Sequence, residues 1–442
     1  MGGGLLVPSG DGDASANAGA ERLASAWGKA IMTTKKQITN YVQDPYKQVS
    51  YLQQCLSNDK RPLGLFLGAG CPVAVRIGDD KRTPLIPDIA GMTNVVREKL
   101  SEGKETKPLL TIVDKHFKED GQNDVSLEDM LSHIRALRVV AGNAKVRDLS
   151  AEDLDKLDAD ICQIIHKLAD KTLPSNETPY HCTAVWAGAA DREMPVEVFT
   201  TNYDLLMEQA FEDSRVPYFD GFAGSRKPFF DLRAMDEDLL PARWARLWKL
   251  HGSINWYQDP EKGVLRGAAS EESLKRVIHP SHLKYDESRR MPYLAMIDRL
   301  RVFLKQPSVA LVLCGYSFRD DHLNEIIIQG LQRTPTAIAF ALLYDEIGKY
   351  GKAVKLASEC LNLSLLARDG GIISGQEAKW PEKNTDSISP DSRTGVTWVS
   401  VNPDDKDTRV AHFTLGDFSE FGTFLREIVG HSHQSLETSN AQ

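Results

Sequence analysis

The stretch LGLFLGAG, residues 63–70, decides the fold, because an unbroken apolar run ends there in three small residues. Such runs are typical of parallel strands that are buried on both faces of a sheet. The Gly-Ala-Gly ending lets a phosphate approach the backbone closely, since no large side chain intervenes. Two interpretations stay open: a phosphate-binding turn, or a tight turn whose glycines serve packing alone. The six-position dinucleotide fingerprint is incomplete, because Cys71-Pro72-Val73 follows, and no P-loop motif is present.

Further segments with strand character follow in the chain, separated by stretches with room for crossover helices. They are residues 196–203, 246–250, 308–315, 336–344 and 396–401. The Ser-, Pro- and Asp-rich stretch 374–395 is predicted to be a polar loop. The alternation predicts an α/β fold with a mostly parallel sheet and helices on both faces.

Helical patterns with little strand character predict an inserted helical lobe at about residues 100–180. Its two clearest helices begin at the capping sequences Ser126-x-x-Asp129 and Ser150-x-x-Asp153. Helices are also predicted within 40–60, 89–100 and 415–430. We expect one domain over residues 36–430, a disordered N-terminal tail over 1–35 and a flexible C-terminal tail over 431–442.

Composition narrows the classes of function. Lys and Arg number 53 against 62 Asp and Glu, a net charge of −9, so bulk charge does not favour nucleic acid. The longest apolar runs are shorter than the roughly 20 residues that cross a bilayer, and no secretory signal pattern is present, so we expect a cytoplasmic protein. The six cysteines form no C-x-x-C pair, which argues against a zinc ribbon, and we expect no metal.

The segment TTNYD, residues 200–204, directly follows one predicted strand. Polar side chains at the carboxyl ends of parallel strands point into the crevice where open α/β sheets bind ligands. The Asn202 amide can hold a water molecule or a ribose hydroxyl while staying neutral. Asp204 is expected to cap the next helix or fix the turn more readily than to act in catalysis.

Two more polar segments follow strands. KLHGS, residues 249–253, contains His251, whose imidazole titrates near neutral pH and is a natural proton acceptor, although a lone histidine is more often structural. GYSFRDDHLN, residues 315–324, follows the most strand-like run, and Gly315 and Ser317 are candidates to line a phosphate or ribose pocket. Asp321 and His322 start a helix or contribute to a metal site, but no second cluster supplies further ligands.

In this order, GAG (68–70), TTNYD, KLHGS and GYSFRDDH (315–322) resemble the sirtuin-like NADase family of prokaryotic anti-phage defence. The resemblance spans about residues 60–430 and implies a Rossmann-like NAD⁺ domain with a helical insertion. It implies that Asn202 and His251 are the catalytic pair, Asn202 positioning water or the ribose and His251 acting as base. It also implies nucleotide contacts for Gly68, Ala69, Gly70, Asp88, Thr201, Asp204, Gly315 and Ser317.

The resemblance further implies an NAD⁺ hydrolase that releases nicotinamide and ADP-ribose, with NAD⁺ as substrate. Control by homo-oligomerisation or by a HerA-type hexameric ATPase is expected from relatives of this compact type. Ile89-Ala90 replaces the Phe-Arg that follows Ile-Pro-Asp in protein-deacylating sirtuins, and the zinc-binding C-x-x-C pairs are missing. Protein deacylation or ADP-ribosyl transfer is therefore the second hypothesis, and a non-catalytic sensor of NAD⁺ or ADP-ribose the third.

Overall fold

The fold is taken from a computed structural model that describes most of the chain. It covers residues 41–78, 82–189, 192–237, 240–259, 263–267, 275–278, 292–388, 394–402 and 405–439. The predicted N-terminal tail, residues 1–35, lies outside these described residues.

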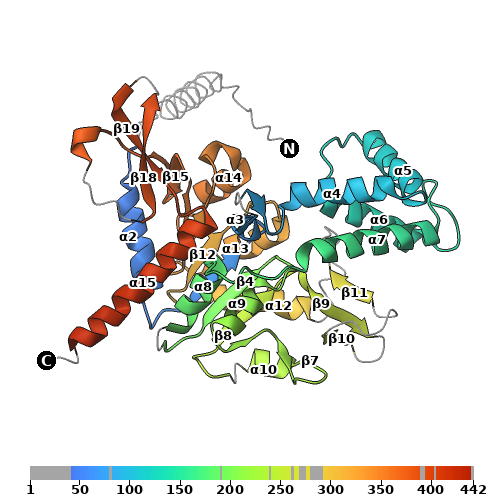
Figure 1. The fold of residues 1–442 in the computed structure, drawn as a ribbon, viewed down its shortest axis with the longest axis horizontal. Helices are drawn as coiled ribbons and strands as arrows, with labels where there is room; N and C mark the ends of the chain where they lie inside the picture. Colours follow the sequence, from blue (N-terminus) through green and yellow to red (C-terminus); the bar gives the residue numbers. More distant parts are fainter. Residues whose placement is uncertain are drawn as a thin grey trace, which may run out of the picture.

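A mostly parallel, Rossmann-like sheet of nine strands forms the centre of the molecule (Figure 1). Its order is β16-β15-β14-β13-β12-β1-β4-β8-β5. The parallel strands are β1 (Leu63–Leu67), β4 (Val196–Thr200), β5 (Tyr218–Phe219), β8 (Ala245–Lys249), β12 (Ala310–Cys314), β13 (Ile338–Leu342) and β14 (Leu363–Leu366). Antiparallel β15 (Gly370–Ile373) and β16 (Gln376–Lys379) close one edge.

The strand register aligns the carboxyl ends of the central strands. Leu67 pairs with both Thr200 and Cys314, and Thr200 pairs with Lys249. The residues that follow these strands therefore share one edge of the sheet. From β1 the chain proceeds to β4 on one side, whereas β12 lies on the other, so a topological switch point falls at β1, where open α/β sheets bind ligands.

Helices cover both faces of the sheet, because alternate strand residues feed two separate hydrophobic cores. Leu65 and Val198 belong to the core that contains α2 (Pro45–Leu56), α8 (Pro179–Ala189), α9 (Leu206–Asp213) and α15 (Phe418–Ser439). Phe66 and Phe199 belong to the core that contains α12 (Tyr293–Leu304), α13 (Asp321–Arg333) and α14 (Gly351–Glu359). The predicted fold class is confirmed.

A lobe of four helices is inserted between β1 and β4 and extends to one side of the sheet (Figure 1). The helices are α4 (Ile89–Glu102), α5 (Thr106–Glu119), α6 (Leu127–Ala141) and α7 (Ala151–Ala169). Ser126 with Asp129, and Ser150 with Asp153, form complete capping boxes at the starts of α6 and α7. The short α3 (Gly70–Ala74) and the hairpin of β2 (Arg76–Ile77) and β3 (Thr83–Pro84) precede the lobe.

Two smaller antiparallel sheets differ from the sequence expectation. The predicted strand 396–401 is β18 (Val396–Asn402), but it pairs with β19 (Asp405–Phe413) beside β17 (Glu382–Asn384), outside the central sheet. The predicted loop 374–395 contains β16 and β17. The other sheet joins β6 (Phe222–Ala223), β7 (Phe229–Phe230), β9 (Gly252–Asp259), β10 (Gly263–Arg266) and β11 (Lys275–Ile278), with α10 (Leu232–Asp236) nearby in the chain.

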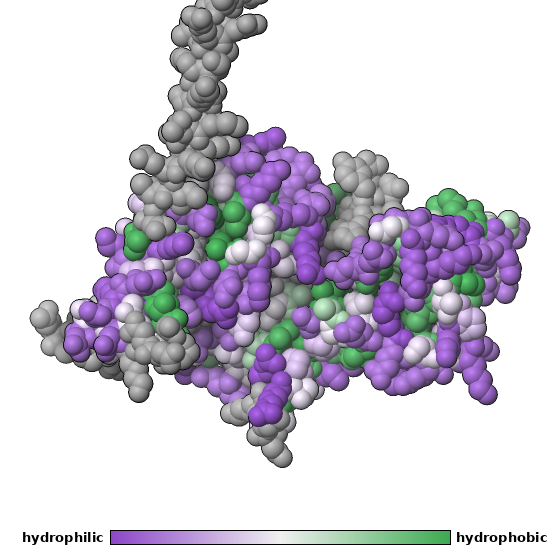
Figure 2. All heavy atoms as spheres, turned by 90° about the horizontal axis from the view of Figure 1, so that it is seen from above, coloured by the Kyte–Doolittle hydropathy of each residue, from purple (hydrophilic) through white to green (hydrophobic). Residues whose placement is uncertain are grey.

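The closing helix α15 continues to Ser439, into the predicted C-terminal tail of residues 431–442. The face seen from above is mainly hydrophilic, with small separate hydrophobic areas (Figure 2). Within the part of the chain that the structure describes, no helix has both the length and the apolarity to span a bilayer.

Candidate active site

A cavity of about 110 Å³ lies at the switch point, beyond the carboxyl ends of β1, β4, β8 and β12. The strand loops supply Ala69, Pro72, Thr201, Asn202, Tyr203, Asp204, His251, Gly315, Tyr316, Ser317, Arg319 and Asp320. The β3–α4 segment and the lobe supply Ile86, Pro87, Ile89, Met92, Glu128 and Ala169. A second cavity of about 380 Å³ adjoins it between α4 and the α5–α6 loop, since Ile89 and Arg319 line both.

The glycines of the first loop serve close backbone packing. The Gly68 N–H donates to Cys314 O (2.9 Å) and the Gly70 N–H donates to Gly315 O (3.0 Å). A Cβ atom on Gly68 would lie 2.3 Å from Gly315 O, and Gly315 itself adopts a φ of +67°. Gly68 and Gly70 therefore allow the loops after β1 and β12 to pack closely against each other. Both glycines lie behind the cavity surface that Ala69 and Gly315 form.

Asn202 is held at the end of β4 by two hydrogen bonds. Its backbone N–H donates to Thr200 Oγ1 (3.0 Å), and its Nδ2 donates to Gly68 O (3.1 Å). The second bond ties the amide to the glycine loop of β1. The side chain is half-buried and lines the cavity, so its amide can hydrogen-bond a ligand there.

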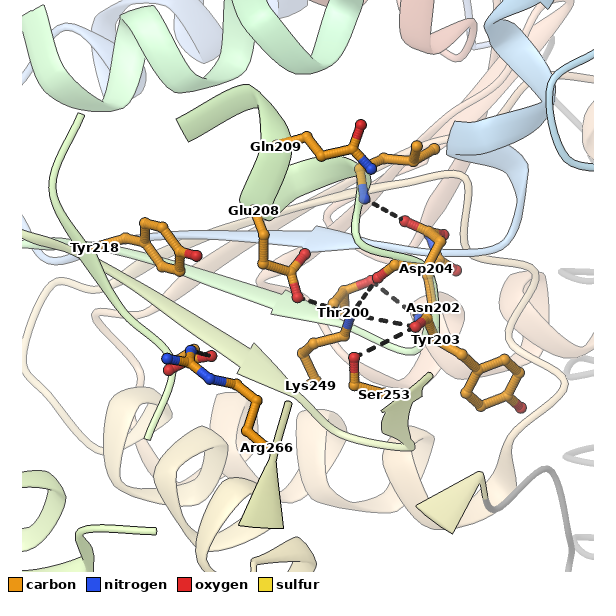
Figure 3. Close-up of polar contacts among 12 residues, drawn as sticks. Thr200, Asn202, Tyr203, Asp204, Glu208, Gln209, Tyr218, Lys249, Ser253 and Arg266 are labelled. Carbon is orange, nitrogen blue, oxygen red and sulfur yellow. Dashed lines mark hydrogen bonds and ion pairs between the residues drawn. The ribbon is translucent and has the colours of Figure 1, made fainter. Parts of the chain in front are cut away.

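A buried lysine fixes the loop that carries Asn202 (Figure 3). Lys249 Nζ donates to the backbone oxygens of Tyr203 and Asp204 and to Glu208 Oε1, the last at 2.9 Å. The Asp204 carboxylate accepts the Leu206 N–H (3.0 Å), which is the turn-fixing role that we considered. Burial raises the pKa of Asp204 and of Glu208, and the Lys249 charge opposes both rises.

His251 is paired with a carboxylate. Its Nε2 lies 3.1 Å from Asp320 Oδ2, and the exposed fractions of the two side chains are 8% and 12%. Asp320 Oδ1 accepts the N–H groups of His322 (3.1 Å) and Leu323 (3.2 Å), so the same carboxylate caps α13. Asp320 therefore holds the imidazole against a rigid helix start, an arrangement that stabilises a protonated imidazole.

The structure brings most predicted site residues together. Asn202, His251, Ala69, Thr201, Asp204, Gly315 and Ser317 line one cavity, with Gly68 and Gly70 directly behind it. Asp88 does not line it: the side chain is exposed and caps α4 by accepting the Gly91 N–H (2.8 Å). Asp321 pairs with Lys352 (2.7 Å) on the surface.

Three cavity residues escaped the sequence analysis. Asp320 stands inside a motif that we quoted, but its pairing with His251 joins residues 69 positions apart. Arg319 is the only Lys or Arg among the described residues that line the cavity, and no ion pair with another described residue engages it. Glu128 comes from the helical lobe, and no local sequence signal marks it.

The described residues contain no group of three or more His, Cys, Asp or Glu side chains that could hold a metal ion. All six cysteines are free. Cys71 is buried beneath the loops, where its Sγ donates to Cys314 O (3.3 Å) and burial raises its pKa. The thiol therefore packs the loops and is not a nucleophile.

Comparison with known proteins adds a family similarity. Residues 196–362 match the SIR2-like domain family. The match begins at β4 and includes the segments that carry Asn202, His251, Gly315 and Ser317. No curated protein matches the sequence.

Among solved structures, the chain is similar to one described as "Structural Basis for the Mechanism and Regulation of Sir2 Enzymes". The identity is 14% and the TM-score 0.32, over 68% of this chain and 85% of the other.

Proposed function

We propose that this protein hydrolyses the nicotinamide–ribose bond of NAD⁺ and releases nicotinamide and ADP-ribose. The observation that carries the proposal is that Asn202 and His251, from different strands, line one cavity with the glycine loops of β1 and β12. The similarity of residues 196–362 to SIR2-like domains supports NAD⁺ as the substrate class. Arg319, which lines the cavity wall, supplies a cation for a diphosphate.

The chemistry asks little of the protein beyond positioning and charge stabilisation. The nicotinamide ring nitrogen is cationic in NAD⁺, so the ring is already a good leaving group. Asn202, tied to Gly68 O, would orient the attacking water or a ribose hydroxyl. His251 would accept the proton that the nucleophile loses, and Asp320, 3.1 Å away, would stabilise the resulting imidazolium.

The direct test measures nicotinamide release from NAD⁺ by the full-length chain and by Asn202→Ala and His251→Ala. We expect turnover by the parent protein and a loss of at least about 100-fold in each variant, since each removes a group that acts on the reacting atoms. Lys352→Ala, which changes only a surface ion pair with Asp321, is the control. Unchanged turnover in both site variants would remove the assignment.

The same assay separates the competing activities. A protein deacylase or ADP-ribosyltransferase would release nicotinamide only when an acylated or acceptor protein is added. A sensor would bind NAD⁺ or ADP-ribose tightly without releasing nicotinamide at all. Hydrolysis is favoured because the six scattered cysteines offer no zinc-binding C-x-x-C pair of the kind found in protein-deacylating sirtuins.

The biological role that we propose is depletion of NAD⁺ as an anti-phage effector of the cytoplasm, under control of assembly. An enzyme that destroys NAD⁺ must be kept inactive in a healthy cell. The family resemblance points to homo-oligomers and to a HerA-type hexameric ATPase as the controlling partner. Light scattering on the isolated chain gives the oligomer mass, and NAD⁺ loss with and without the ATPase tests control. Equal turnover in both conditions would exclude the ATPase as an activator.

A further inference from the structure

The helical lobe contributes a carboxylate to the cavity. Glu128 stands in the first turn of α6 and lines the same cavity as Asn202 and His251. The other residues that the lobe helices add to this wall are Ile89, Met92 and Ala169, all apolar. Among the described residues, Glu128 is therefore the one charged residue that the lobe helices contribute to the cavity wall.

The fold of the lobe does not explain this carboxylate. The capping box of α6 is completed by Ser126 and Asp129, with Ser126 Oγ accepting the Asp129 N–H. The side chain of Glu128 is half-buried, and its carboxylate makes no hydrogen bond or ion pair with any other described residue. A partly buried carboxylate without a partner costs stability, so a structural role is not apparent.

The neighbouring helix offers a direct comparison. In α7, Glu152 occupies the same position relative to the capping box of Ser150 and Asp153. Both glutamates interact equally well with their helix dipoles. Glu152 is exposed and does not line the cavity. The two positions therefore differ in burial and in the cavity that Glu128 lines.

The charge of Glu128 is felt by two tyrosines of the cavity wall. Burial raises the pKa of Tyr203, and Glu128 adds to the rise. Burial also raises the pKa of Tyr316, with further contributions from Asp320, Asp321 and Glu128. Tyr203 follows Asn202 in the chain, and the Tyr316 hydroxyl donates to Asp320 O (3.3 Å). The negative charge of Glu128 thus acts on the end of the cavity where Asn202 and His251 lie.

We propose that Glu128 is a catalytic residue that stabilises positive charge on the ribose; the inference rests on the proposed hydrolysis of NAD⁺. When the bond between C1′ and the nicotinamide nitrogen breaks, its electron pair goes to the nitrogen. The positive charge then moves from the ring to C1′ and the ribose ring oxygen. Water adds to C1′ and loses one proton to His251. A carboxylate facing this carbon is more favourable in the transition state than in the ground state.

The proposal also gives the lobe a role. The glycine loops, Asn202 and His251 belong to the central sheet, whereas Glu128 belongs to the inserted helices. A partner that shifts the lobe would move this carboxylate relative to the ribose without touching the sheet. The lobe would thereby control the rate of bond cleavage more than the affinity for the nucleotide.

The first test compares Glu128→Gln with the matched control Glu152→Gln in the full-length protein. Each change removes one charge at the same helical position beside an intact capping box, so each loses the same small interaction with its helix dipole. We expect kcat for nicotinamide release to fall about 10- to 100-fold in Glu128→Gln, with KM within about twofold of the parent value. Glu152→Gln should retain the parent kcat.

The second test measures binding and does not depend on turnover. The probes are ADP-ribose and an ADP-ribose analogue whose terminal ribose is replaced by a protonated pyrrolidine, a mimic of the cationic ribose. Titration calorimetry should show that the parent protein and Glu152→Gln bind the cation about tenfold more tightly than ADP-ribose, and that Glu128→Gln loses this preference. Glu128→Asp, with the charge on a shorter chain, should retain part of it.

Equal kcat values and equal cation preference in Glu128→Gln and the parent protein would overturn the role of Glu128. Loss of cation preference in Glu128→Gln would uphold it. A parent protein that binds ADP-ribose but releases no nicotinamide would refute the hydrolysis instead, so the two failures are distinguishable. Thermal unfolding of Glu128→Gln at or above the temperature of the parent protein excludes a loss of folding as the cause.

Discussion

Replacement of Asp320 by Asn tests the pairing between His251 and the start of α13. Asn has the shape of Asp and is an equally good helix N-cap, so its Oδ1 can still accept the N–H groups of His322 and Leu323. The change therefore removes one negative charge, 3.1 Å from His251 Nε2, and leaves the helix start in place.

The magnitude follows from the burial of the pair. The exposed fractions of 8% and 12% leave little water to screen the interaction. A hydrogen bond to a charged group contributes about 1.5–3 kcal/mol, against about 0.5–1.5 kcal/mol for a neutral one. With Asn Oδ1 still accepting the helix N–H groups, Nδ2 replaces Oδ2 beside His251, so the protonated imidazole loses this hydrogen bond. The loss corresponds to at least about a tenfold fall in kcat.

The assay is steady-state release of nicotinamide, with kcat and KM measured separately. Asp44→Asn is the matched control, because Asp44 caps α2 by accepting the Tyr46 N–H (3.0 Å) but is exposed and does not line the cavity. We expect at least about a tenfold lower kcat for Asp320→Asn and the parent kcat for Asp44→Asn. A kcat for Asp320→Asn within twofold of the parent value would refute the pairing argument. An equal loss in both variants would assign the effect to capping.

Other perturbations test the fold. Gly315→Ala should lower the free energy of unfolding in urea by about 2 kcal/mol, since φ is +67° and the added Cβ would lie 2.7 Å from Cys71 N. An unchanged urea midpoint would contradict the close packing of the loops after β1 and β12. Ser150→Ala should cost about 1 kcal/mol in the same experiment, because it removes the cap of α7. Burial lowers the pKa of His116 and of His133, and His116 Nδ1 lies 3.0 Å from His133 Nε2. Below about pH 6.5 the unfolded chain therefore binds more protons than the folded protein. The free energy of unfolding should therefore fall as the pH drops from about 6.5, and His133→Gln should flatten this dependence; a parallel curve for the variant would exclude the pair as its source.

Much of the fold could be predicted because the central strands carry their own signal. β1, β12 and β13 are uninterrupted apolar runs, which only a doubly covered sheet accommodates. The starts of α6 and α7 coincide with their predicted capping sequences, because capping is a local interaction. Loop glycines at strand ends likewise indicated the edge where the cavity lies.

The remaining features depend on contacts between distant segments. β18 has the composition of a central strand, but its partner is β19, and strand composition does not specify a partner. Two-residue strands such as β5 and β6 are too short to show any alternation. The functions proposed for Asp320 and Glu128 arise only where the fold brings α13 and the lobe to the cavity, so neither could be read from its neighbours in the chain.

The interlocked glycine turns after β1 and β12 bear on how a nucleotide would be captured. Because Gly68, Gly70 and Gly315 already touch through their backbones, the conformational entropy of both turns is lost when the chain folds, not when a ligand arrives. A dinucleotide would meet a preorganised floor and would need to order only the opposite wall. A substitution that loosens these turns should therefore weaken nucleotide binding, because the ordering that folding now completes would have to occur on binding.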